Sequence, residues 1–209
     1  MRNRLREFLI AASRQSRSEM RSSLKIGILA VQGAFAEHEQ MLEQLGAEYI
    51  ELRKGEDVRQ SYDGLILPGG ESTVQGKLMR ELDMFDTIQS QIKNGMPVLA
   101  TCAGAILLAQ QLSNDAATHL ATLPAVVRRN AYGRQLGSFS VDEQIEGIGT
   151  FPMRFIRAPY IEKVLDDTKV LAKVDGNIVM VENKNQLAMS FHPELTSDTR
   201  IHEMFLKKI

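Results

Sequence analysis

Three short, almost continuous apolar runs constrain the fold of this chain more than any other feature. They lie at residues 24–31 (LKIGILAV), 62–70 (YDGLILPGG) and 96–101 (MPVLAT). Such runs are typical of strands that are buried on both faces of a parallel sheet. Helix-like patterns at 36–47 and at about 74–93 separate them. The alternation predicts an α/β fold of three layers, with a mostly parallel open sheet and helices on both faces.

The helical patterns differ in how clearly they end. The pattern at 36–47 has one apolar face and a glycine, Gly46, where a helix would stop. The face is formed by Met41, Leu42 and Leu45. A further strand is expected at 47–52, and the long pattern predicts a single helix that Asn94 and a glycine close. Another helix is expected to begin within residues 105–112 (AILLAQQL).

The second half of the chain changes character and predicts short strands joined by tight turns. A turn at Asp175-Gly176 is one example. These strands suggest some antiparallel pairing added to the parallel sheet. An amphipathic helix at 198–209, capped by Ser197 or Asp198, is expected to close the fold. The strand candidates are 125–130, 137–141, 150–156, 169–174, 177–183 and 186–191.

Length and composition restrict the class of protein. The chain has 209 residues, enough for one sizeable domain, with 44% hydrophobic and 24% charged residues. A net charge of -1 argues against a general nucleic-acid binder, which needs a basic surface. A single cysteine excludes an intrachain disulfide, and no apolar run reaches the roughly 18 residues of a membrane span. We therefore expect a cytoplasmic protein.

Residues 1–23 differ from the rest of the chain. They are rich in Arg and Ser and contain only two acids, Glu7 and Glu19. The segment is interpreted as a basic extension, disordered or upstream of a true start at Met20, in preference to an organelle-targeting segment. The globular domain is expected to span 24–209.

The one cysteine, Cys102, lies between an apolar strand and a helix start. Ala100 and Gly104 flank it at two residues' distance, as the crowded turn of a nucleophile elbow requires. A thiol at a helix N-terminus also has a lowered pKa, because the helix dipole favours the thiolate. The local pattern fits a buried structural cysteine equally well.

A reactive thiolate needs a base, and the chain has four histidines. His38 and His202 lie among polar residues of helical patterns and are expected at the surface. His119 lies in a loop-like stretch without an obvious partner. His192 instead follows an apolar strand and precedes a proline and Glu194, whose carboxylate could orient the imidazole.

The two glycines that end the run at 62–70 provide a third element. At Gly69 and Gly70 the backbone N–H groups can approach a ligand closely. Together with the N–H of Ala103, the residue after the cysteine, they could stabilise a tetrahedral oxyanion. In isolation this stretch would be interpreted as an ordinary Pro-Gly turn.

The three elements in this order, PGGES, TCAG and FHPE, resemble the class I (triad) glutamine amidotransferases. The blocks AVQGAFAEH, RRNAYGRQ and FIRAP extend the resemblance to the family of glutaminase subunits of pyridoxal 5'-phosphate synthases, over residues 25–209. The resemblance implies a flavodoxin-like sheet. It also implies hydrolysis of L-glutamine to L-glutamate and ammonia through a Cys-His-Glu triad.

The resemblance assigns roles to individual residues. Cys102 would be the nucleophile, His192 the base and Glu194 its orienting carboxylate, with Gly70 and Ala103 as the oxyanion donors. The glutamine-binding residues would be Gly70, Glu71, Ser72, Arg129, Ile156 and Arg157. An arginine suits the α-carboxylate of free glutamine, whereas the adjacent Arg128 is interpreted as a solvated neighbour.

The resemblance also implies a partner and no cofactor. The ammonia would pass to a synthase subunit that condenses it with a pentose phosphate and a triose phosphate, so pyridoxal 5'-phosphate is a product of the complex. No metal, nucleic acid or membrane is expected. Gln32 and Gly33 are candidates for a switch or interface with the synthase, although an ordinary βα loop fits them equally well.

The chain departs from the family pattern at two places, and two alternative functions remain open. The family's elbow usually has Gly where Ala100 stands, from which we expect a slightly tighter turn and no loss of activity. Residues 1–23 have no counterpart in the family pattern. The alternatives are a glutaminase that serves another synthase and a non-catalytic regulatory subunit of the same fold. The complete triad weighs against the latter, and a stress-related or peptidase relative would lack the GGES and HPE pairing.

Overall fold

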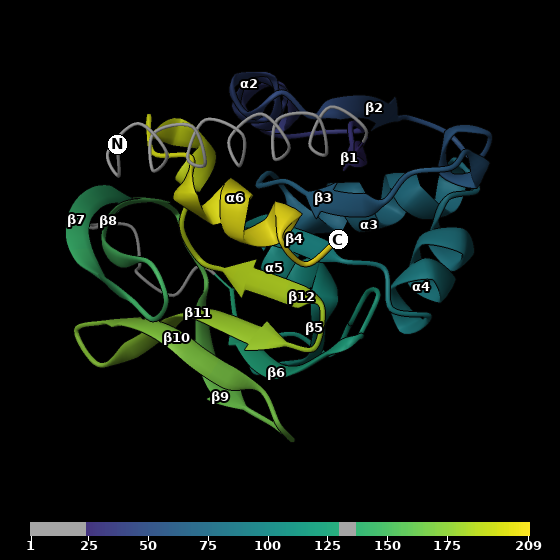
Figure 1. Ribbon diagram of the computed structural model, residues 1–209. Helices are drawn as coiled ribbons and strands as arrows, with labels where there is room; N and C mark the ends of the chain where they lie inside the picture. The colour runs from purple at the N-terminus through teal and green to yellow at the C-terminus, as the bar shows by residue number, and fades with distance from the viewer. Residues whose placement is uncertain (1–23, 130–136) are drawn as a thin grey trace, which may run out of the picture.

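The computed structural model describes residues 24–129 and 137–209, which fold around a large mixed sheet (Figure 1). The sheet order is β2-β1-β3-β4-β12-β11-β9-β6-β5, and β10 pairs with β11. Five strands form its parallel part: β2 (Glu48–Leu52), β1 (Lys25–Leu29), β3 (Gly64–Leu67), β4 (Val98–Thr101) and β12 (Gln186–Met189).

The remaining strands extend the sheet with mostly antiparallel pairs, as the second half of the sequence predicts. β11 pairs antiparallel with β12, β10 and β9, while β9 pairs antiparallel with β6. A separate antiparallel hairpin joins β7 (Ser138–Ile145) to β8 (Gly149–Ile156). The other bounds are β5 (Ala109–Leu112), β6 (Leu123–Arg128), β9 (Tyr160–Val164), β10 (Lys169–Val174) and β11 (Asn177–Asn183).

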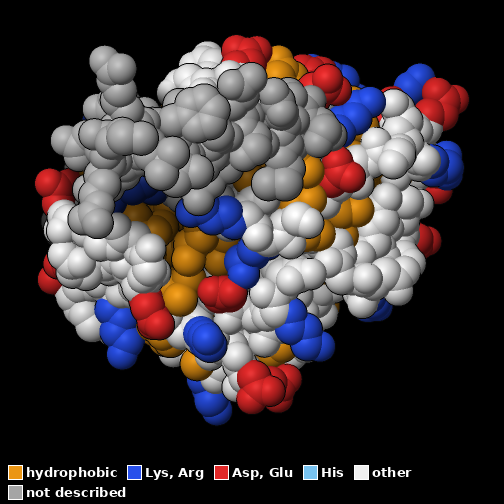
Figure 2. Space-filling view, in the orientation of Figure 1, with side chains coloured by type: hydrophobic (Ala, Val, Ile, Leu, Met, Phe, Trp, Pro, Cys, Tyr) orange, Lys and Arg blue, Asp and Glu red, His pale blue; other side chains and the backbone are white. Residues whose placement is uncertain are grey.

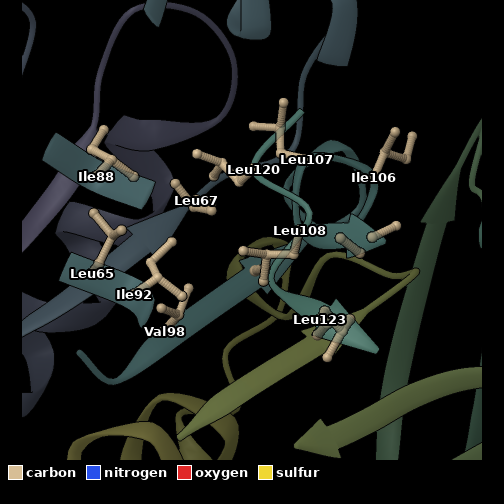
Figure 3. Packing of buried hydrophobic residues seen from close by; sticks show 14 of the residues in the cluster. Leu65, Leu67, Ile88, Ile92, Val98, Ile106, Leu107, Leu108, Leu120 and Leu123 are labelled. Carbon is tan, nitrogen blue, oxygen red and sulfur yellow. The ribbon is translucent and has the colours of Figure 1, made fainter. Parts of the chain in front are cut away.

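Two cores, one on each face of the sheet, confirm the three-layer prediction. Leu65 and Leu67 of β3 belong to the core on the face covered by the helices α3 (Ser72–Glu81), α4 (Phe85–Lys93) and α5 (Ala103–Leu108). Figure 3 shows them beside Ile88 and Ile92 of α4 and Leu107 of α5. Ile66, between Leu65 and Leu67, points to the opposite face because side chains alternate along a strand. That face is covered by α2 (Phe35–Leu45), α6 (Arg200–Leu206) and the β7–β8 hairpin.

The prediction of one helix over 74–93 is wrong. The chain forms α3 and α4, separated by a turn in which Asp83 has φ 56°. Asp tolerates this left-handed conformation better than most residues, and it ends the helical path. Met84, just after it, is fully buried, so the turn still contributes to the core. Apolar residues at helical spacing on both sides of the turn made the sequence look like one continuous helix.

The pattern at 105–112 also forms two elements where one helix was expected. Helix α5 ends at Leu108, and residues 109–112 pair parallel with β6 as strand β5. Ala109 and Leu112 are buried, whereas Gln110 and Gln111 are exposed. The pairing with a strand beyond an intervening loop overrides the local helical pattern.

The expected turns at Gly46 and at Asp175-Gly176 are confirmed, whereas the expected cap of the last helix is not. Gly46 ends α2 in the left-handed conformation with φ 70°. Asp175 and Gly176 both have positive φ, as a tight hairpin turn requires. At the start of α6, the carboxylate of Asp198 accepts a hydrogen bond from the backbone N–H of Arg200 at 3.1 Å. The N-cap itself is Thr199, without a side-chain cap bond, so the prediction of Ser197 or Asp198 as the cap is wrong, although Asp198 contacts the helix start.

The surface shows no segregation by charge on the face in Figure 2, where acidic and basic side chains of the described residues are intermixed. Within ranges 24–129 and 137–209, no helix has the length and apolar character needed to cross a bilayer. The predicted basic extension at 1–23 and most of the RRNAYGRQ block, at 130–136, lie outside the described residues.

Candidate active site

Three adjacent parallel strands bring the predicted site together. β4 lies between β3 and β12, so the carboxyl ends of all three meet at one edge of the sheet (Figure 1). The glycine pair Gly69-Gly70 follows β3, Cys102 follows β4, and His192 follows β12. This is the edge at which open parallel sheets place their active sites.

The backbone at Cys102 has the strained geometry of a nucleophile elbow. Its φ of 48° and ψ of -102° are uncommon for a residue with a side chain. Its N–H donates to the carbonyl of Met189 at 2.8 Å, and α5 begins at the next residue, Ala103. As first residue of that helix, Ala103 has an N–H without an intrahelical acceptor. The cysteine sulfur lies 3.9 Å from the carbonyl oxygen of Ile156.

The two small residues beside the elbow have different surroundings. A Cβ on Gly104 would lie 2.1 Å from the carbonyl oxygen of Leu67, so α5 touches the backbone of β3 there. Ala100 is fully buried in the sheet with its side chain accommodated. A residue without a side chain is therefore needed at Gly104, whereas the elbow has room for an alanine side chain at position 100.

His192 and Glu194 form the pair that the HPE motif predicts. The imidazole Nδ1 lies 2.6 Å from Glu194 Oε1, and the backbone N–H of His192 donates to the carbonyl of Arg154 at 2.8 Å. Burial opposes protonation of His192, but contacts with Cys102 and Glu194 outweigh it and raise its pKa to about 10. Burial raises the pKa of Glu194, and the nearby imidazole opposes that shift. A histidine that is readily protonated can deliver a proton to a leaving group.

A pocket of about 480 Å³ opens above these groups. Ten of the twelve residues to which the resemblance assigns a role line it, and Ala103 and Glu194 do not. Gly69, Ala34 and Ile106 also line the pocket, and no role had been predicted for Ala34 or Ile106. The pocket-lining site residues are Gln32, Gly33, Gly70, Glu71, Ser72, Cys102, Arg129, Ile156, Arg157 and His192.

Arg129 is held at the pocket by two carboxylates. Its Nη1 lies 2.8 Å from Asp115 Oδ2, and its Nη2 lies 3.1 Å from Glu71 Oε1. The side chain of Asn114 bonds both the N–H and the carbonyl of Arg129, which fixes the backbone as well. The neighbouring Arg128 is exposed, as expected. Arg129 is thus a preoriented cation at the pocket.

The loop that carries Gln32 and Gly33 packs directly on the glycine turn. Gln32 Oε1 accepts from the N–H of Glu71 at 2.8 Å, and the N–H of Ala34 donates to the carbonyl of Gly69 at 2.9 Å. A Cβ on Gly33 would lie 1.9 Å from that same carbonyl oxygen, so only glycine fits there. A movement of this loop would therefore reach the candidate oxyanion donors directly.

The expectation that His38 and His202 lie at the surface is wrong. Both are completely buried, with His38 Nδ1 2.9 Å from His202 Nε2. His38 Nε2 also lies 3.6 Å from Glu194 Oε2. His38 precedes the buried Met41 and Leu42 by three and four residues, so its place on the inner helix face was visible in the sequence. Its polar neighbours outweighed that signal.

Groups of histidine, cysteine and acidic side chains with the geometry of a metal site are absent from the described part of the chain. The fourth histidine, His119, packs against Gly76, where a Cβ would lie 2.1 Å from its Nδ1. Burial lowers the pKa of His119. It takes no part in the pocket described above.

Comparison with known proteins identifies the family of the chain. The model of the SNO glutamine amidotransferase family matches residues 28–209. A Desulfitobacterium hafniense protein named pyridoxal 5'-phosphate synthase subunit PdxT is 62% identical over 186 residues, covering 89% of this chain and 94% of that protein. The PdxT of Streptococcus pneumoniae strain CGSP14 is 52% identical over 187 residues, covering 88% and 96%.

Solved structures confirm the predicted fold. A crystal structure described as a glutamine amidotransferase superposes with a TM-score of 0.83 at 43% identity, covering 88% of this chain and 97% of that one. The PurLQS structure from Thermotoga maritima has a TM-score of 0.60 at 18% identity, which supports the fold alone. The family predicted from the motifs is confirmed: the chain belongs to the SNO glutamine amidotransferase family.

Proposed function

We propose that this chain hydrolyses L-glutamine to L-glutamate and ammonia and delivers the ammonia to a synthase subunit that makes pyridoxal 5'-phosphate. The observation that carries the proposal is the cysteine elbow beside a histidine–glutamate pair, at a pocket with a fixed arginine. The identity to PdxT proteins supports the choice of product and partner.

In the proposed mechanism, the Cys102 thiolate attacks the carboxamide carbon of glutamine. The C–O double bond opens to an oxyanion, which the N–H groups of Gly70 and Ala103 stabilise. His192, oriented by Glu194, gives its proton to the amide nitrogen, and the C–N bond breaks to release ammonia. A γ-glutamyl thioester remains. His192 then removes a proton from water, which attacks the thioester, and glutamate leaves as the thiol is restored.

We assign recognition of the amino-acid end of glutamine to the pocket mouth. Arg129 would bind the α-carboxylate, since a guanidinium forms paired hydrogen bonds with a carboxylate. Glu71, which already pairs with Arg129, has the charge to bind the α-ammonium group. Ser72, Ile156 and Arg157 are assigned the remaining contacts with the substrate.

The proposal also covers the partner and the extent of the domain. Gln32 and Gly33 are assigned to a switch that responds to the synthase, supported by their contacts with the glycine turn. Residues 24–209 are assigned to one glutaminase domain in the cytoplasm, with 1–23 as an extension. No metal or cofactor is assigned to this chain.

A glutaminase assay with and without the synthase subunit tests this function. Glutamate release is expected to increase when the synthase is added, and pyridoxal 5'-phosphate should form from glutamine, a pentose phosphate and a triose phosphate. Absence of glutamine turnover in the complex would contradict the glutaminase assignment. Glutamine turnover without product formation would instead favour a glutaminase that serves another synthase.

Replacement of Arg129 tests the substrate contact. R129Q is expected to raise KM for glutamine by roughly 10- to 100-fold and to change kcat by less than about threefold, because a charged hydrogen bond that forms on binding is lost. Steady-state kinetics of the complex would measure both constants. The matched control is R128Q, on the exposed neighbour, which should leave KM unchanged. An unchanged KM in R129Q would contradict the role of Arg129.

A further inference from the structure

A pair of buried imidazoles lies directly behind the candidate triad. His38 comes from α2 and His202 from α6, two helices that pack together on the same face of the sheet (Figure 1). Their ring nitrogens, Nδ1 of His38 and Nε2 of His202, are 2.9 Å apart. Burial lowers the pKa of His38 well below its usual range and that of His202 to about 4. Both rings are therefore neutral near pH 7, and one must donate to the other.

The carboxylate of Glu194 needs a second partner. Its Oε1 faces His192 at 2.6 Å, but its Oε2 is buried without a hydrogen bond to any residue that the structure describes. The group that faces Oε2 is His38 Nε2 at 3.6 Å. The same nitrogen lies 3.3 Å from Thr101 Oγ1, which in turn accepts from the N–H of Gly69 at 3.0 Å. His38 therefore lies between the triad carboxylate and the glycine turn.

One arrangement of protons gives every N–H of the two rings a partner. If His202 donates from Nε2, His38 accepts at Nδ1 and holds its own proton on Nε2, directed at Glu194 and Thr101. His202 Nδ1 is then a bare acceptor. The opposite arrangement would bury an N–H at His202 Nδ1, which has no partner among the described residues, and would set a His38 lone pair against the carboxylate. A buried unpaired donor and a facing pair of acceptors are both unfavourable.

We propose that His38 is a positioning residue of the triad, whose Nε2–H, fixed by His202, holds the carboxylate of Glu194 in line with His192. The inference rests on the proposed function for its catalytic meaning. Through Thr101, the same imidazole also supports the turn that carries the candidate oxyanion donors. His38 does not touch the pocket, so it acts only through these neighbours.

The tautomer of His38 in the unaltered full-length chain provides the first test. Nitrogen-15 NMR is expected to show His38 protonated on Nε2 and bare on Nδ1, with His202 protonated on Nε2. Finding His38 protonated on Nδ1 would overturn the proposal. This measurement needs neither a variant nor activity, so it stands even if the glutaminase assignment fails.

A pair of amide substitutions provides the second test. The side-chain NH₂ of Gln can approach the place of imidazole Nε2, whereas the shorter Asn side chain reaches only the place of Nδ1. H38N is therefore expected to lower kcat of the complex by roughly 10- to 100-fold, with KM changed less than about threefold. H38Q is expected to recover most of that loss. H119Q, at a histidine that does not line the pocket, should leave kcat close to that of the unaltered protein.

Two measurements distinguish a positioning role of His38 from a general effect of the substitution on protein stability. Because Cys102 is the only cysteine, alkylation by iodoacetamide reports on it alone. H38N should slow alkylation near neutral pH and shift its pH profile, and it should weaken the low-field proton NMR signal of the His192–Glu194 hydrogen bond. H38Q should retain both signals. Equal behaviour of H38N and H38Q in these readouts, changed or unchanged, would overturn the proposal.

A second substitution pair covers the case in which H38N does not fold. H202Q keeps an amide that can donate to His38 Nδ1, whereas H202M fills similar space and cannot donate. H202M is expected to slow alkylation of Cys102 and H202Q to preserve it. If H202M leaves both the alkylation profile and the His38 tautomer unchanged, His202 does not fix His38 and the proposal fails.

Discussion

Replacing Cys102 with Ala is expected to lower kcat for glutamine hydrolysis by on the order of 10⁴-fold or more, as removal of a covalent nucleophile does in other triad enzymes. The backbone is expected to tolerate the change, because Ala and Cys both carry a Cβ at this strained φ of 48°. Glutamate release by the complex measures the loss, and circular dichroism checks that the chain remains folded.

Ser at the same position sharpens this test. C102S keeps a hydroxyl within reach of His192, but a serine hydroxyl is far less acidic than a thiol, so the loss should be nearly as large. A100G, which installs the residue usual at this place in the family, is the control and should retain activity. More than about a tenth of the original kcat in C102A would contradict covalent catalysis by Cys102.

Replacing Gly104 with Ala is expected to destabilise the chain by about 2–3 kcal/mol, or roughly 4–12 °C in Tm. The added methyl would lie 2.1 Å from the carbonyl oxygen and 2.9 Å from the carbonyl carbon of Leu67, and backbone atoms cannot rotate out of the way. Helix α5 would have to move off β3, and Cys102 lies at its start. Urea unfolding and glutaminase activity are both expected to show the damage.

Gly137 provides the matched control for that substitution. A Cβ there meets none of the described residues within 4 Å, and its φ is not in the left-handed region. G137A should therefore change the free energy of unfolding by less than about 1 kcal/mol. If G104A were as stable and as active as G137A, the close approach of α5 to β3 would not be a requirement of the elbow.

The sequence predicts the residues of the candidate site better than it predicts the strand pairing that brings them together. The motifs at Cys102, His192 and Gly70 each follow an apolar run, and the general rule for parallel sheets places such residues at one edge. The sequence alone does not say that β4 pairs with both β3 and β12. The pairing of Ala100 with Ala188 joins residues far apart in the chain, and only the folded sheet specifies it.

The errors at sequence level have a common physical origin. Local patterns predicted a continuous helix through Asp83 and a surface position for His38, and in both cases tertiary packing decided otherwise. The buried Met84 stabilises a turn that the helical pattern conceals, and the imidazole of His202 provides the polar partner that permits burial of His38. A polar residue that finds its only partner on another helix gives a single sequence little indication of its burial.

The position of β12 has a consequence for the newly made chain. This strand is the last of the sheet along the sequence, yet it lies between β4 and β11 and leads directly to His192. A growing chain that has not yet reached residue 186 has an elbow cysteine but neither its base nor the strand that accepts its N–H. Glutamine hydrolysis therefore requires that the chain has been made through β12 and His192, because an earlier intermediate lacks the base.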